Sequence, residues 1–155
     1  AARKAFAFKD SVHRPWQRGQ ICFLALADAD KTDGVLPVIR KLQEQGAVWA
    51  ATAGTAAWLG AIGFTVTHVV ADEQDLAALL QREVVAFSLI TATKGNRRGR
   101  SGFTLRSRLV QQGVPLFTAV ETFALYVESI TENRGEGHAA CEDIGSLCKR
   151  AIGQL

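Results

Sequence analysis

The chain of 155 residues contains no methionine, one tyrosine, three prolines and three cysteines. Three is an odd number and Cys22 lies inside an apolar run, so we do not expect disulfides to define the fold, which favours a cytoplasmic protein. No apolar run approaches the roughly 20 residues of a membrane helix, and no signal peptide is recognisable. The net charge of +3 is far from the charge of a nucleic-acid-binding domain. We therefore expect neither a membrane nor a nucleic-acid partner.

The residues that are present indicate a single globular domain. Hydrophobic residues make up 48% of the chain and charged residues 21%, which is typical of a folded protein with one core. The mildly basic balance suits an anionic small ligand. Because the sequence begins at Ala1 without an initiator methionine, we expect it to be a piece of a longer protein.

Buried-type strands alternate with amphipathic segments along the chain. Three of the segments with helical spacing are followed by a glycine, at Gly46, Gly63 and Gly113, where a left-handed cap would end the helix. The apolar runs predict strands over 21–27, 48–52, 64–70, 84–91 and 114–118. The helical spacing predicts helices over 34–45, 55–62, 75–82, 103–112 and 121–130.

This alternation predicts an α/β fold. Parallel βαβ units with right-handed crossovers favour a three-layer Rossmann-like sandwich around a mainly parallel five-stranded sheet. We place this domain at residues 20–131. Residues 1–19 form a lead-in, and residues 132–155 form a tail that is either flexible or helical.

Ligands of open parallel sheets bind beyond the carboxyl ends of the strands, so the residues directly after each strand are the candidates for a site. Four of these five strand ends are rich in hydroxyl groups or cations, which are the groups that hold a phosphate or a carboxylate. They carry Asp28, Asp30, Lys31 and Thr32; Thr52, Gly54 and Thr55; Thr91, Thr93, Lys94, Arg97, Arg98 and Arg100; and Thr118 and Thr122.

The segment Thr52-Ala53-Gly54-Thr55 joins a buried strand to a helix. The hydroxyls of Thr52 and Thr55 could simply cap the helix, and the residue pattern alone favours that interpretation. Alternatively, Thr52 turns its hydroxyl toward a ligand, Gly54 lets the backbone approach it closely, and the helix amides face an anion.

The stretch from Thr93 to Gly102 holds four cations, three glycines and no acid. It is either a solvated loop or a flap that closes over an anion, and the residues favour neither. It is not a phosphate-binding P-loop, because no G-x-x-x-x-G-K-[ST] motif is present.

Catalytic and metal-binding patterns are scarce. His68 falls inside a strand, where a structural role is expected. His138 lies near Cys141 and Cys148 at spacings that match no zinc motif, so no metal or other cofactor is expected. A magnesium site among the aspartates around Lys31 has weak support. The chain alone is not expected to be an enzyme.

The segment ADADKTDGVLPVIRKLQEQGAVWAATAGTAAWLGAIGF at residues 27–64 resembles the methylglyoxal-synthase-like (MGS-like) domain that ends the large chain of carbamoyl-phosphate synthetase. The similarity continues through LITATKG and TLRSRLVQQGVPLFT to the last helix, and it covers about residues 20–130. The lead-in ARKAFAF resembles the end of the preceding synthetase domain.

This resemblance implies a regulatory domain. Members of the family bind UMP, IMP or an N-acylated amino acid and pass the signal to synthetase domains that use ATP and Mg²⁺, beside a glutaminase small subunit, and they can contribute to oligomer contacts. The family's effector site would then fall on Lys31, Thr52, Gly54, Thr55, Thr91, Thr93, Lys94, Arg97, Arg98, Arg106 and Thr118.

Two positions depart from the nucleotide-binding members. Ala71 stands where they carry a second lysine, and Thr91 stands where they carry an asparagine. Methylglyoxal synthase itself is an alternative, but it uses an aspartate after strand four, where this chain has Thr91-Ala92-Thr93-Lys94. A domain that serves only oligomerisation is a further alternative.

Overall fold

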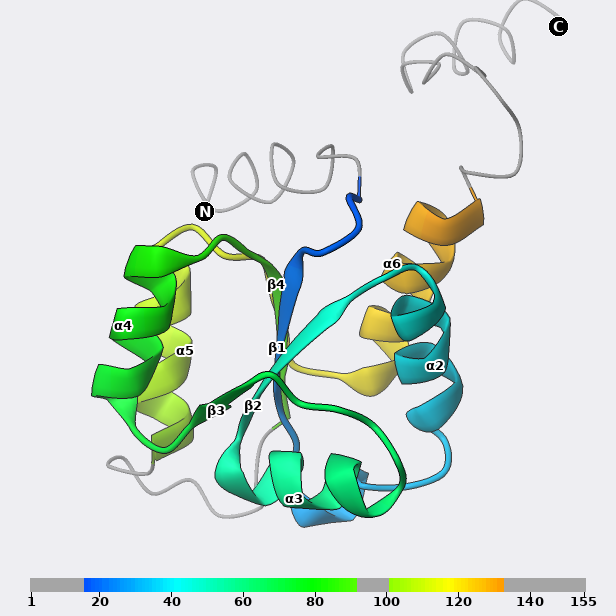
Figure 1. The fold of residues 1–155 in the computed structure, drawn as a ribbon, viewed down its shortest axis with the longest axis horizontal. Coiled ribbons are helices and arrows are strands. Elements are labelled where there is room, and N and C mark those ends of the chain that lie inside the picture. The colour runs from blue at the N-terminus through cyan, green and yellow to red at the C-terminus, as the bar shows by residue number, and fades with distance from the viewer. Residues whose placement is uncertain (1–15, 92–100, 133–155) are drawn as a thin grey trace, which may run out of the picture.

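A computed structural model of the chain describes residues 16–91 and 101–132 (Figure 1). Its sheet has five strands in the order β3-β2-β1-β4-β5, and every neighbouring pair is parallel. The expected fold class is confirmed. The strands are β1 (Ile21–Ala25), β2 (Val48–Thr52), β3 (His68–Val70), β4 (Val85–Ile90) and β5 (Leu116–Phe117).

Helices cover both faces of the sheet, which gives the three layers (Figure 1). On one face lie α2 (Leu36–Glu44) and α6 (Val120–Glu132), and on the other α4 (Glu73–Arg82) and α5 (Ser101–Gln111). The helix α3 (Ala53–Ala61) follows β2 at the carboxyl ends of the strands, and the short 3-10 helix η1 (Asp28–Asp30) follows β1 at the same edge. Within the described residues, no helix has both the length and the apolar character needed to cross a membrane.

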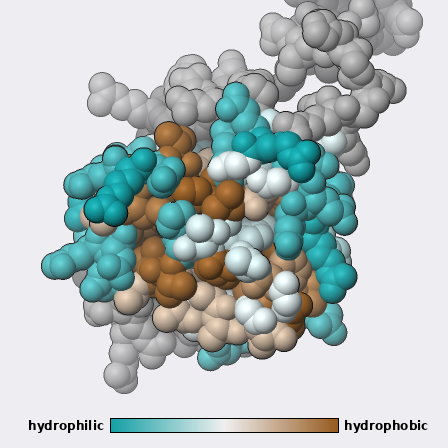
Figure 2. All heavy atoms as spheres, in the orientation of Figure 1, coloured by the Kyte–Doolittle hydropathy of each residue, from teal (hydrophilic) through white to brown (hydrophobic). Residues whose placement is uncertain are grey.

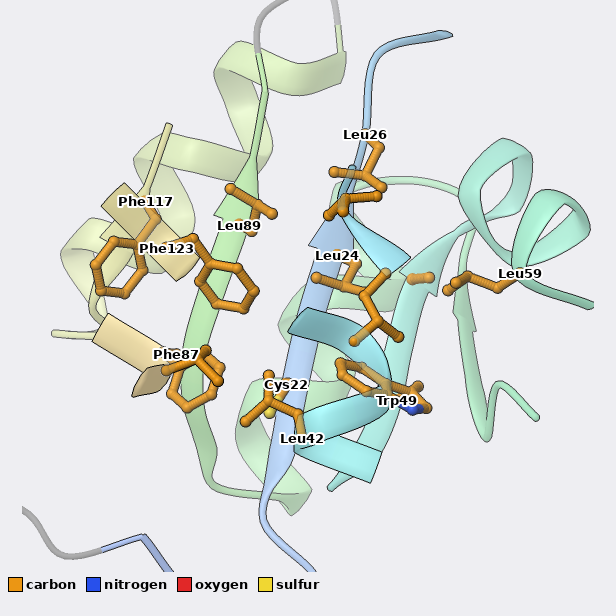
Figure 3. Packing of buried hydrophobic residues seen from close by; sticks show 14 of the residues in the cluster. Cys22, Leu24, Leu26, Leu42, Trp49, Leu59, Phe87, Leu89, Phe117 and Phe123 are labelled. Carbon is orange, nitrogen blue, oxygen red and sulfur yellow. The ribbon is translucent and has the colours of Figure 1, made fainter. Parts of the chain in front are cut away.

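The core consists of two clusters, one on each face, because successive residues of a strand point to opposite sides. In β1, Cys22 and Leu24 pack in the cluster under α2 and α6, whereas Ile21 and Phe23 pack under α4 and α5. Figure 3 shows the first cluster, with the ring of Phe87 beside Cys22. Cys22 is fully buried, as expected for a cysteine that serves as a small hydrophobic residue.

The first cluster also contains Trp16, which is 6% exposed and lies with its ring centre 5.5 Å from that of Phe87. Trp16, the first described residue, thus already belongs to the core, although it lies inside the expected lead-in of residues 1–19. The structure describes nothing of residues 133–155, so the expected tail lies outside the described residues apart from Glu132, the last residue of α6.

The strand and helix boundaries differ from the expected ones by a few residues. The strand expected over 21–27 ends at Ala25, and the one expected over 64–70 begins only at His68. The helix expected over 55–62 begins two residues earlier, at Ala53. Gly46 has a φ of 80° after α2, and Gly63 and Gly113 are also at positive φ, which confirms the left-handed ends predicted for three helices.

The edge strand β3 is only three residues long. Figure 2 shows the side of the molecule that is seen in Figure 1, where apolar side chains gather in the middle between hydrophilic margins. Val69 of β3 is 55% exposed. A short edge strand leaves few free backbone groups, which limits pairing with another chain.

Candidate functional site

The chain that leaves β1 is held by two threonine hydroxyls from neighbouring elements. The backbone N–H of Leu26 donates to Thr55 Oγ1 over 2.9 Å, and the N–H of Ala27 donates to Thr91 Oγ1 over 2.8 Å. Both bonds are buried. They end the strand at Ala25, because the next two amides bind side chains in place of a strand partner.

Neither hydroxyl of the Thr52–Thr55 pair caps α3, so the capping interpretation is wrong. Thr52 occupies the N-cap position with an extended backbone, but its side chain makes no capping hydrogen bond. Its hydroxyl donates instead to Thr55 Oγ1, at 3.1 Å. Thr55 lies inside the first turn of α3 and is 1% exposed. The Oγ1 atom of Thr55 points toward the end of β1, where it accepts from Leu26, and so it does not cap α3.

The amino terminus of α3 therefore retains its ability to attract an anion. The first amides of a helix have no acceptor within the helix, and the helix dipole makes this end positive. Ala53 and Gly54, the first two residues of α3, are both exposed. Thr52 is partly exposed next to them.

The side chain of Lys31 lies against this helix end. A Cβ added at Gly54 would be 3.6 Å from Lys31 Nζ, which shows that the ammonium group is close to the α3 backbone. Lys31 Nζ also donates to Asp28 Oδ1, at 2.6 Å. The hydrogen bond and the positive charge of Lys31 lower the pKa of the Asp28 carboxyl from its ordinary value.

Five of the predicted site residues are thus brought together by contacts within the structure: Lys31, Thr52, Gly54, Thr55 and Thr91. Lys31, Thr52 and Gly54 present a cation, a hydroxyl and exposed helix backbone at one edge. Thr55 and Thr91 are 1% and 9% exposed and lie underneath. A cation, a hydroxyl and a helix amino terminus can together hold a phosphate or a carboxylate.

The other predicted residues are not joined to this group. Thr118 is exposed just after β5, two strands away from β1 and so roughly 10 Å across the sheet. Arg106 lies in the second turn of α5 with a partly exposed side chain. Thr93, Lys94, Arg97 and Arg98 lie outside the described residues, so the flap predicted there stays a prediction.

The pairing of Asp28 with Lys31 is the main feature that sequence reasoning missed. Asp28 and Asp30 were expected only as strand-end residues or as weak magnesium ligands, and no pairing with Lys31 was expected. The spacing of three residues across a short turn is a signal that could have indicated the ion pair. Among the described residues, no cluster of three His, Cys, Asp or Glu side chains could hold a metal ion.

A pocket of about 410 Å³ lies at the opposite, amino-terminal ends of β4 and β5. Aromatic and apolar residues line most of it, including Trp16, Phe87 and Tyr126. Neither Lys nor Arg is among its described lining residues, whereas Glu83 is. The described lining of this pocket therefore offers an anion no positive charge. The better candidate is the set of Lys31, Thr52 and Gly54 at the carboxyl ends of the strands, called the carboxyl-end group below.

Comparison with known proteins agrees with the fold. The MGS-like domain family matches residues 34–118, a span that contains β2, α3 and Gly54. The carbamoyl phosphate synthase large chain of Thermomicrobium roseum is 34% identical over 121 residues, covering 74% of this chain. The chain spans only 11% of that relative's length. The resemblance seen in the sequence is confirmed: the chain belongs to the family of MGS-like domains and is homologous to part of a carbamoyl phosphate synthase large chain.

Proposed function

We propose that the carboxyl-end group binds an anionic small-molecule effector, with UMP or IMP as the first candidates. The observation that carries this proposal is the position of Lys31 Nζ beside Gly54 in the first turn of α3. In this arrangement the phosphate accepts hydrogen bonds from Lys31 and from the α3 amides, while the Thr52 hydroxyl donates to it in place of Thr55.

The effector regulates a larger enzyme in this proposal. The relative is a large chain of carbamoyl phosphate synthase, and the present chain matches a small part of it. We propose that this chain is the regulatory domain of such a large subunit, in the cytoplasm. The remaining synthetase domains, with ATP and Mg²⁺, and a glutaminase small subunit then perform the ligase chemistry. The domain itself is proposed to be non-catalytic, because Thr91 and no carboxylate directly follows β4.

Calorimetric titration of the chain with UMP, IMP, N-acetylglutamate and inorganic phosphate at low salt tests the proposal. Saturable binding of a nucleotide is expected. Lys31→Met should weaken it about 10- to 100-fold, the scale of one charge-assisted hydrogen bond. Thr52→Ala should weaken it by roughly 2- to 10-fold, the scale of a neutral hydrogen bond.

Lys41→Met is the matched control, because it removes the same charge from the last turn of α2. Affinity in that variant should remain within about twofold of the parent, since Lys41 is partly exposed and distant from the site, where its charge is screened. The absence of binding by all four ligands to a folded chain would contradict the proposal and favour a role in assembly. Equal losses in both lysine variants would show that only net charge matters.

A further inference from the structure

We propose that Asp28 competes with the effector for Lys31. The Asp28 carboxylate pairs with Lys31 in the free protein and is displaced when an anion binds. This inference rests on the proposed function, since it concerns the same site. Asp28 would thereby lower the affinity of the site for every anion that binds Lys31.

The first support is the geometry of the ion pair. Asp28 Oδ1 lies 2.6 Å from Lys31 Nζ, so the carboxylate already holds the ammonium group that an effector would use. The two side chains differ in exposure: that of Asp28 is 94% exposed, whereas that of Lys31 is only 15% exposed. The carboxylate can therefore swing into solvent at little cost, while the lysine stays at the site.

The second support is that the position of Lys31 does not depend on Asp28 alone. The turn that carries it is fixed by the Leu26–Thr55 and Ala27–Thr91 hydrogen bonds. A backbone hydrogen bond of 2.9 Å from the N–H of Asp30 to the carbonyl of Ala27 closes the same turn. Removing the Asp28 carboxylate should therefore free the Lys31 charge and leave the turn in place.

The expected effect follows from competition for one cation. In this proposal every anion that uses Lys31 replaces the same carboxylate, so affinity is lowered by one common factor whatever the rest of the ligand contains. Exposed ion pairs contribute little, and their measured range corresponds to a factor of about 1.5 to 5 in affinity. Asp28 thus sets the effector concentration at which the site fills, but it does not change which class of ligand the site binds.

Calorimetry of Asp28→Asn with inorganic phosphate and with UMP tests the inference. We expect both ligands to bind about two- to fivefold more tightly than to the parent chain, by similar factors. Asp33→Asn is the matched control, because Asp33 is an exposed carboxylate two residues after Lys31. It makes the same change in net charge, but the structure describes no ion pair between Asp33 and Lys31, so affinity should change by clearly less than in Asp28→Asn.

A second measurement reads the displacement directly. The carboxyl of Asp28 is titrated by NMR with and without saturating UMP, and its pKa should rise when the ligand occupies Lys31. The inference would be overturned if Asp28→Asn bound the ligands no more tightly than the parent and the pKa of Asp28 did not change with ligand. If Lys31→Met still lost binding in that case, the proposed function would stand without the inference. Absence of binding in the parent, in Asp28→Asn and in Lys31→Met would instead contradict the proposed function itself.

Discussion

The hydroxyl oxygen of Thr55 accepts the backbone N–H of Leu26 across 2.9 Å, and this bond joins the first turn of α3 to the end of β1. It lies directly beneath the proposed effector site. Together with the Ala27–Thr91 bond it determines where the turn carrying Lys31 leaves the sheet. The position of the cation is therefore governed by two buried hydroxyls that do not face the solvent.

Thr55→Val removes the acceptor and leaves the buried N–H of Leu26 without a partner. We expect it to lower the free energy of unfolding by about 1–3 kcal/mol, which is the cost of an unsatisfied buried group. Thr55→Ser keeps the hydroxyl and should cost less than half as much. Urea denaturation followed by circular dichroism measures both values. A loss in Thr55→Ser with almost none in Thr55→Val would mean that the methyl group, and not the hydrogen bond, matters at this position.

Thr91→Val should likewise lower the free energy of unfolding by about 1–3 kcal/mol, because it leaves the buried N–H of Ala27 without an acceptor. Because both threonines fix consecutive residues of one turn, the double variant Thr55→Val/Thr91→Val should lose less than the sum of the single variants. The same denaturation curves give this coupling. Strict additivity would indicate that the two hydrogen bonds act on separate parts of the structure.

The carboxyl of Asp28 should titrate below its ordinary pKa in the folded chain, because Lys31 donates to it. A carboxyl with a lowered folded pKa favours the folded state above its unfolded pKa, and that contribution disappears as the pH falls through the folded pKa. In Lys31→Met the pKa of Asp28 should return to its ordinary range. NMR titration of the Asp28 side chain checks both statements, and a pKa unaffected by Lys31→Met would contradict the ion pair.

Burial raises the pKa of the Cys22 thiol well above its ordinary value. The thiolate is the reactive form, so Cys22 should not react with a thiol reagent at pH 8 in the native chain. It should become reactive as urea unfolds the protein. To isolate this thiol, the measurement uses the variant Cys141→Ser/Cys148→Ser. Rapid labelling of the native variant would show that the core around Cys22 opens without global unfolding.

Much of the fold could be predicted because the signals are local. Apolar runs identified the strands, and helical spacing followed by glycine identified the ends of three helices, at Gly46, Gly63 and Gly113. The edge strand was predicted too long, since the sequence does not show how much of the run 64–70 pairs with β2. Only His68–Val70 makes that ladder.

The site could be predicted only in part. The rule for parallel sheets pointed to the carboxyl ends of the strands, and Lys31, Thr52 and Gly54 do meet there. The role of the buried threonines could not be predicted, because Thr55 and Leu26 are 29 residues apart and Thr91 and Ala27 are 64 apart. Such partners are chosen by tertiary packing, whereas a threonine before a helix suggests a cap from local pattern alone.

The central claim is that an anion binds between Lys31 and the amino terminus of α3. The most direct test is an NMR titration of the ¹⁵N-labelled chain with UMP. The account predicts that the amides of Ala53, Gly54 and Lys31 shift together, with one dissociation constant, and that these shifts are lost in Lys31→Met. Shifts confined to residues around the Trp16 and Tyr126 pocket, with the α3 amides unchanged, would contradict it.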